Sequence, residues 1–198
     1  NVGCVNSSST KIIKALTKDD ASGCATMTVQ GNAKNSQYTI RYTFYPDATV
    51  DMKTTFSPSG ATRRLGLGLQ LASGFENVEF YARGPRSNYS DRKTGSYLGR
   101  FTTTVDDMVE EQIHPQTYGD HEDLRELLLS NKEEGLTLTV RVDGQASFSL
   151  SHYDESKWIE EGSDLWKIPT HWYDLVRKPQ VFAHIDYWQR GLGNNSCQ

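Results

Sequence analysis

The chain lacks several features by which large classes of protein are recognised. It has no apolar run near the ~20 residues of a membrane-spanning helix. Its net charge is -4, with 21 basic against 25 acidic residues, whereas a domain that binds nucleic acid is usually clearly basic. Its 198 residues are too few for a (β/α)8 barrel, which takes about 250. We therefore expect no membrane span, no nucleic-acid partner and no such barrel in this chain.

Cysteine is scarce and widely scattered. The three cysteines are Cys4, Cys24 and Cys197, and no CxxC motif occurs. An odd number cannot pair completely within one chain, and a structural zinc site needs clustered ligands. We therefore expect three free thiols and no structural zinc, and the cysteines leave the compartment open.

Apolar residues are also few, at 36% of the chain, while aromatic residues reach 11%. This composition favours strands exposed on one face over elements buried on both. The dominant pattern alternates apolar and polar residues, which is typical of strands. Such segments lie at 37–45, 50–56, 65–71, 78–80, 136–142, 148–150 and 181–188. Because turn signals separate them, we expect an all-β fold, one large antiparallel β-sandwich domain over residues 1–198.

Two of these segments predict more than a strand. In 65–71 four leucines alternate with Gly66 and Gly68, so one face is nearly bare backbone and another group is expected to pack closely there. Segment 181–188 carries bulky side chains on both faces, which favours a central place in its sheet. His184 and Asp186 share one of these faces, where they can line a site or form a hydrogen-bonded pair within the fold.

Helix signals are few. Residues 154–161 predict one short helix, capped by Asp154 and ended by Gly162. Residues 123–129 fit either one helical turn or a strand. The stretches 84–123 and 162–180 look irregular, and long ordered loops are often functional. One or two short helices are therefore expected beside the strands.

The simplest catalytic motifs are incomplete. A glycosidase needs two carboxylates across a sugar bond, but neighbouring acids on a strand point to opposite faces, so the adjacent acid pairs are interpreted as surface charges. These pairs are Glu110-Glu111, Glu133-Glu134 and Glu160-Glu161. The HExxH motif that His121 begins fails at Arg125. The glycines Gly191 and Gly193 lack a GxGxxG or Walker context and predict a turn.

The densest polar segment is 83–92, which leaves a strand, turns at Gly-Pro and then presents amide, phenol, carboxylate and guanidinium groups. Asp91 and Arg92 offer the acceptors and donors that sugar hydroxyls require. The same groups can instead hold a long loop in place through charged hydrogen bonds. The residues alone favour the second interpretation, because most polar loop residues serve the local backbone.

At this segment the chain resembles a known family. Residues 65–71 and then 78–92 (VEFYARGPRSNYSDR) resemble the C-terminal domain, or small chain, of the family 2 β-galactosidases, which shows a Gly-Pro, Glu-Asn-Tyr, Asp-Arg run after such a strand, with Ser87 here in place of the usual Glu. Residues 115–125 resemble a later segment of that domain, with Thr117 in place of Glu. Residues 184–193 resemble its closing strand and glycine turn. The likeness runs from about residue 25 to the end of the chain.

The resemblance implies a galactose mutarotase-like supersandwich within an enzyme that hydrolyses terminal β-galactosides with retention. In that family the catalytic glutamates and the magnesium ligands lie in a (β/α)8 barrel. The resemblance therefore implies no catalytic residue, cofactor or metal in this chain, and Mg in the catalytic domain of the parent enzyme. The implied partners are the catalytic barrel domain of the same polypeptide, the β-galactoside substrate and a second copy in a homo-oligomer.

The resemblance also supplies candidate sugar contacts. Well-known members place a sugar-stacking Trp after the glycine turn, at or near the position of Cys197, and a thiol lacks the aromatic face that sugar C–H groups prefer. The candidate substrate-binding residues are Asn88, Tyr89, Asp91, Arg92, His184, Asp186, Asn194, Asn195 and Cys197. Asn194 also begins an Asn-Asn-Ser glycosylation acceptor pattern.

Two further functions stay open, an independent carbohydrate-binding module and a mutarotase-like enzyme. The second would need a carboxylate base and a histidine acid, for which His184 and Asp186 are the candidate pair. The chain begins at Asn1 without Met or a signal-peptide pattern and stops at Gln198, where the family continues. We therefore expect a segment of a larger enzyme, with an edge exposed for pairing.

Overall fold

The structure is a computed structural model that describes residues 11–18, 21–33, 36–59, 64–110, 119–154 and 175–189. Apart from one three-residue 3-10 helix, the elements of these residues are strands, and every strand pairing is antiparallel. The all-β antiparallel fold predicted from the sequence is confirmed. The chain forms two compact units, Gly3–Thr62 and Arg63–Gln198 with Asn1–Val2. The single domain over residues 1–198 stays a prediction.

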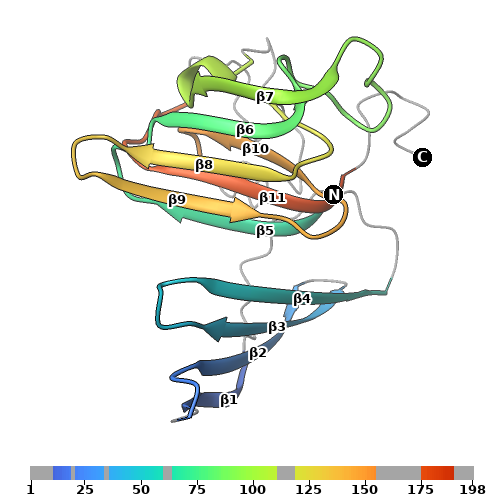
Figure 1. Ribbon diagram of the computed structural model, residues 1–198. Coiled ribbons are helices and arrows are strands. Elements are labelled where there is room, and N and C mark those ends of the chain that lie inside the picture. Colours follow the sequence, from blue (N-terminus) through green and yellow to red (C-terminus); the bar gives the residue numbers. More distant parts are fainter. Residues whose placement is uncertain are drawn as a thin grey trace. The chain divides into compact units, whose positions relative to one another are not determined.

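The unit Gly3–Thr62 contains one four-stranded sheet in which strands follow the order of the chain (Figure 1). Its strands are β1 (Lys11–Lys18), β2 (Ala25–Ala33), β3 (Ser36–Phe44) and β4 (Val50–Pro58). The hairpin expected from alternation at 37–45 and 50–56 is present as β3 and β4, with Phe44 opposite Val50. Cys24, just before β2, is a free thiol as predicted, whereas Cys4 and Cys197 lie outside the described residues.

The second unit contains a three-stranded sheet in the order β10-β11-β5 and a four-stranded sheet in the order β7-β6-β8-β9 (Figure 1). The elements are β5 (Arg64–Leu71), β6 (Asn77–Gly84), β7 (Tyr97–Thr104), the 3-10 helix η1 (Asp106–Met108), β8 (Glu126–Asn131), β9 (Leu136–Arg141), β10 (Ser147–Ser151) and β11 (Val181–Gln189). Strand β11 has a partner on each side, so its predicted central position is confirmed.

One apolar core joins the two sheets of this unit. It combines Phe80 of β6 and Leu127 of β8 with Phe148 of β10 and Val181 of β11, each at most 2% exposed. Burying an aliphatic or aromatic side chain of this size stabilises a fold by about 1.5–3 kcal/mol. Because the core lies between two antiparallel sheets, this unit is a β-sandwich, as the sequence predicted.

The structure corrects two sequence expectations. The stretch 84–123 is not irregular throughout, because β7 and η1 lie within it. Among the described residues strand β7 pairs with β6 alone, and its side chains are exposed or half-buried, so it carries little of the apolar alternation that marks a strand in sequence. The ambiguous stretch at 123–129 runs into strand β8. Apart from Asp154, the short helix predicted at 154–161 lies outside the described residues.

Within the part of the chain that the structure describes, no helix is both long enough and apolar enough to cross a bilayer.

Candidate functional site

The loop that follows β6 is held by the side chain of Asn88. Its Nδ2 donates to the carbonyl oxygens of Arg83 at 2.9 Å and Arg86 at 3.0 Å, and its Oδ1 accepts from the Glu122 backbone N–H at 3.0 Å. Its own backbone N–H donates to the Asp120 carbonyl at 2.7 Å. Since Asn88 is 1% exposed, these bonds fix loop 83–92 to residues 119–123 in a water-poor environment.

Tyr89 lies beside it and is fully buried. Its hydroxyl has no hydrogen-bond partner in the described part of the chain, and burial raises the pKa of the phenol. The Arg92 backbone N–H donates to the Tyr89 carbonyl at 2.8 Å, and the Arg92 guanidinium lies 5.3 Å from the centre of the tyrosine ring. The Tyr89 side chain therefore anchors the turn that presents Asp91 and Arg92 at the exposed end of the loop.

The exposed end of the loop contacts the side chain of Glu110. Arg92 Nη2 donates to Ser87 Oγ at 2.9 Å, and that hydroxyl donates to Glu110 Oε1. Glu110 Oε2 also lies 3.9 Å from Arg92 Nη2. Ser87, which occupies the usual Glu position of the resembled motif, thus connects an arginine to a carboxylate. These contacts are of the loop-holding kind that the residues alone favoured.

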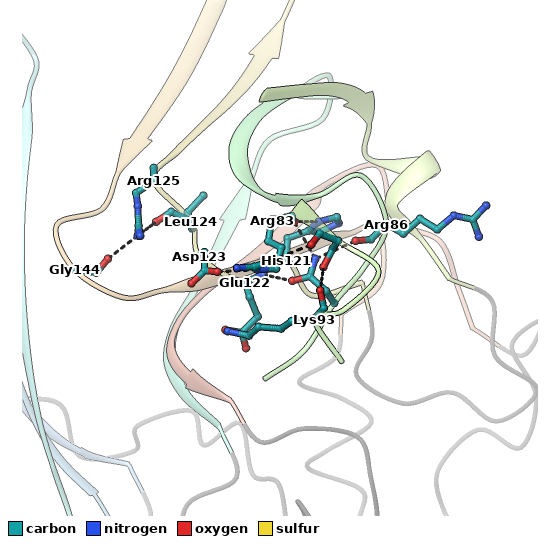
Figure 2. A network of polar contacts seen from close by, with 11 residues as sticks. Arg83, Arg86, Lys93, His121, Glu122, Asp123, Leu124, Arg125 and Gly144 are labelled. Carbon is teal, nitrogen blue, oxygen red and sulfur yellow. Dashed lines mark hydrogen bonds and ion pairs between the residues drawn. The ribbon is translucent and has the colours of Figure 1, made fainter. Parts of the chain in front are cut away.

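Two ion pairs reinforce the base of the loop (Figure 2). Arg83 Nε donates to Asp123 Oδ2 at 2.8 Å, and Arg83 Nη1 donates to the Ser96 carbonyl at 3.1 Å. Lys93 Nζ lies 3.0 Å from Glu122 Oε2, and the Glu122 side chain is 7% exposed. A partly buried ion pair of this kind is screened less by salt than a surface pair, so the loop keeps its position.

His121, the start of the incomplete HExxH motif, packs inside the sandwich. Its Nδ1 donates to the Arg83 carbonyl at 3.0 Å, and its ring contacts those of Phe80 and Phe148 at centroid distances of 4.9 and 5.3 Å. Burial lowers the pKa of His121. The ring is therefore held neutral, as a packing residue between apolar rings.

A second polar region lies on the face of the three-stranded sheet opposite the core, called here the polar face. Pairing places Asp186 of β11 opposite Gly66 of β5 and Ser147 of β10, and His184 opposite Gly68 and Ser149. The residues of the polar face are Arg64, Gly66, Gly68, Ser147, Ser149, Ser151, His184 and Asp186. The predicted common face of His184 and Asp186 is thereby confirmed.

A buried ion pair organises the polar face. Arg64 Nε donates to Asp186 Oδ2 at 2.7 Å, and the two side chains are 8% and 2% exposed. Arg64 Nη2 also donates to Ser149 Oγ at 3.1 Å. A Cβ atom at Gly66 would collide with Asp186 Oδ1 and would lie 2.5 Å from the Ile185 carbonyl oxygen. The bare backbone predicted at Gly66 thus makes room for the Asp186 carboxylate.

Two titratable groups on and beside the polar face have shifted pKa values. Burial, and then the Arg64 guanidinium, lowers the pKa of His184 to about 4. The Asp120 carboxyl is fully buried. Its burial, and next the Asp186 carboxylate, raises the pKa of Asp120 well above its usual range. At neutral pH the ring of His184 is therefore uncharged.

The structure therefore brings some candidate residues together and not others. Asn88 and Tyr89 are buried where loop 83–92 meets residues 119–123, and Asp91 and Arg92 lie at the exposed end of that loop. His184 and Asp186 lie on the polar face. Asn194, Asn195 and Cys197 fall outside the described residues, and the substrate-binding role of all nine stays a prediction.

Sequence reasoning missed Arg64, Asp120 and Glu122. Arg64 could have been found, because it shares the glycine face of 65–71 and thus faces the same side as Asp186 in a paired strand. Asp120 and Glu122 lie in a segment with no periodic pattern, so only the fold identifies them.

Comparison with known proteins shows which family the chain belongs to. A protein-family model described as the β-galactosidase small chain matches residues 4–198. A β-galactosidase of Staphylococcus xylosus is 35% identical over 175 residues, which cover 88% of this chain and 15% of the relative. A β-galactosidase of Lactococcus lactis is 32% identical over 133 residues, which cover 67% of this chain and 12% of the relative. One from Priestia megaterium is 26% identical over 159 residues, covering 79% and 14%. The chain thus spans about 15% of the length of these relatives.

Proposed function

The chain belongs to the β-galactosidase small-chain family, and on that premise we propose that it is the accessory C-terminal domain of a β-galactosidase. The whole enzyme would hydrolyse terminal β-D-galactosides with retention. The catalytic glutamates and Mg²⁺ ligands would lie in a barrel domain of the same polypeptide. The role of this chain would be to support that active site and its carbohydrate binding.

The observation that carries the proposal is the position of Asn88. Within the motif that resembles the family, this amide forms hydrogen bonds with three backbone groups and is 1% exposed. A side chain used in this way shapes a loop and does no chemistry itself. The same loop ends in the exposed Asp91 and Arg92, and we propose that these two residues meet a neighbouring domain or a sugar.

The polar face supports an accessory role as well. Asp186 is paired with the buried Arg64 at 2.7 Å, so its carboxylate is a weak candidate for a general base. His184, with its pKa lowered to about 4, is uncharged at neutral pH and lacks the imidazolium proton that a general acid would donate. These two features argue against the mutarotase-like alternative, whose catalytic pair they would have to form.

One observation favours a second candidate function, the independent carbohydrate-binding module. Tyr187 and Trp188 near the end of β11 are 64% and 42% exposed, and exposed aromatic rings can stack on the C–H face of a sugar. If this candidate is correct, the 198-residue chain binds galactose by itself, and Trp188→Ala weakens that binding about tenfold, whereas Leu136→Ala, an exposed change on β9, leaves it unchanged.

A test on the chain alone separates these functions. Circular dichroism first establishes that the 198-residue chain is folded. We expect no hydrolysis of a chromogenic β-galactoside, no galactose binding by calorimetry and no faster decay of optical rotation in fresh galactose. Hydrolysis would overturn the accessory role, binding lost in Trp188→Ala would establish the module, and faster mutarotation would establish the epimerase.

A further inference from the structure

Three ligand-type side chains far apart in sequence meet at one edge of the sandwich. Glu76 precedes β6, Asp106 begins η1 and His152 follows β10. One ligand atom from each lies within 4.8 Å of the other two. His152 Nε2 is 2.8 Å from Glu76 Oε2 and 3.8 Å from Asp106 Oδ1. We propose that these three groups bind a divalent transition-metal ion, for which Zn²⁺ is the probe.

The hydrogen bonds of His152 call for a cation at this point. The ring is fully buried, and its Nδ1 lies 2.9 Å from the Gln180 carbonyl oxygen. A carbonyl oxygen only accepts, so Nδ1 carries the hydrogen and Nε2 is left with a lone pair when the ring is neutral. That lone pair faces carboxylate oxygens, which also only accept. A positive charge on Nε2, a proton or a metal ion, resolves this arrangement.

The surroundings of the ring match those of a metal-bound histidine. Metal-ligating imidazoles almost always donate their other N–H to a carbonyl or carboxylate, which fixes the ring and the tautomer. His152 does so through Gln180, and its own carbonyl accepts from the Lys178 backbone N–H at 2.8 Å. One imidazole and two carboxylates form a ligand set that Zn²⁺ accepts, with water in a fourth position.

Arg177 completes the arrangement around Asp106. Its Nε and Nη2 donate to the two oxygens of that carboxylate at 3.1 and 2.9 Å, and ligating carboxylates are commonly held by such outer hydrogen bonds. The two carboxylates and Arg177 together leave one net negative charge beside the His152 ring. Because the Glu76 and Asp106 side chains are 38% and 59% exposed, an ion and its water ligands can reach the site from solvent.

The sequence predicted no metal site in this chain, because no sequence motif indicates one. The ligands are separated by long intervals in the chain and become neighbours only through the pairing of the strands. The proposal is independent of the β-galactosidase role, so its test leaves that role unaffected.

Calorimetric titration of the 198-residue chain with ZnCl₂ at pH 7 tests the site. We expect one Zn²⁺ to bind with an affinity that falls about tenfold or more in His152→Gln and in Glu76→Gln. Glu79→Gln, an exposed change on β6, is the matched control and keeps the wild-type affinity. The melting temperature of the wild type and the control, but not of the two ligand variants, should rise with added Zn²⁺.

The contrary results are equally definite. If the folded wild type binds no Zn²⁺, or if all four proteins bind it equally well, a proton and not a metal occupies Nε2 and the proposal is wrong. Should His152→Gln fail to fold because its ring is buried, Glu76→Gln and Asp106→Asn decide the matter, since both of those side chains reach solvent.

Discussion

At the scale of single residues, Asn88 has the clearest predicted effect. Asn88→Ala leaves the Arg86 carbonyl oxygen and the Glu122 backbone N–H without this partner, whereas the Arg83 carbonyl oxygen keeps only its bond from His121 Nδ1. Each unpaired buried group costs about 1–3 kcal/mol, partly offset by water, so we expect the free energy of unfolding to fall by roughly 3 kcal/mol.

Chemical denaturation of the 198-residue chain measures this change. Glu134→Gln, at an exposed turn position, is the control and should stay within about 0.5 kcal/mol of wild type. If Asn88→Ala behaves like that control, the side chain does not hold the loop.

The ring of His184 predicts a pH dependence of stability. In the folded chain its pKa is lowered from 6.5 to about 4, so between these values the unfolded state binds a proton that the folded state does not. The stability that the neutral His184 ring contributes is therefore fully present above pH 6.5. The free energy of unfolding falls by roughly 3 kcal/mol as the pH falls toward 4. His121 acts in the same direction.

Chemical denaturation of the wild type and of His184→Gln at pH 7, 5.5 and 4 isolates the contribution of His184 to the pH dependence of stability. The variant should lose less stability than wild type over this interval, because the contribution of His121 is common to both. Equal losses would mean that the His184 ring is protonated in the folded chain.

The sequence could identify some of these residues but not what they do. Motif resemblance singled out Asn88 and Tyr89, yet their burial depends on the contact between loop 83–92 and residues 119–123, which are distant in the chain. The amide of Asn88 looks the same in sequence whether it meets a sugar or a backbone.

At the scale of strands, the contact between β5 and β11 makes a sharp prediction. A Cβ at Gly66 meets the backbone and side chain across the pair, with Asp186 Cα at 2.6 Å, whereas a Cβ at Gly68 finds only His184 Cε1 at an ordinary 3.6 Å. Gly66→Ala should therefore destabilise the chain by about 1–3 kcal/mol.

Gly68→Ala, on the same face of the same strand, should change stability by less than about 1 kcal/mol. Thermal unfolding of the two variants compares them directly. Equal effects would contradict the close approach of Asp186 to Gly66.

The alternation of apolar and polar residues predicted those strands that have one apolar face and one polar face. The strands β3, β4, β5 and β11 were predicted because each carries apolar residues at every second position. The strands β1, β2 and β7 were not, since threonine, lysine and glycine interrupt the pattern there. Pairing with neighbours, which no local pattern records, determines these strands.

At the scale of the whole molecule, length and family membership support one account. A chain of 198 residues has no room for a catalytic barrel, and it spans about 15% of a β-galactosidase to which it is 35% identical over 175 residues. Its loop 83–92 is held by buried hydrogen bonds, and Asp186, the acidic residue of its polar face, is buried and paired with Arg64. We propose that this chain completes an enzyme whose chemistry takes place in another domain.

Replacing the matching segment of the Staphylococcus xylosus β-galactosidase with this chain tests that claim most directly. Hydrolysis of a chromogenic β-galactoside is compared among the chimera, the relative without the segment, and the chimera carrying Asn88→Ala or Glu134→Gln. We predict activity in the chimera and its Glu134→Gln control, at least tenfold less with Asn88→Ala, and none without the segment. Full activity of the relative without the segment, or an inactive but folded chimera, would contradict the account.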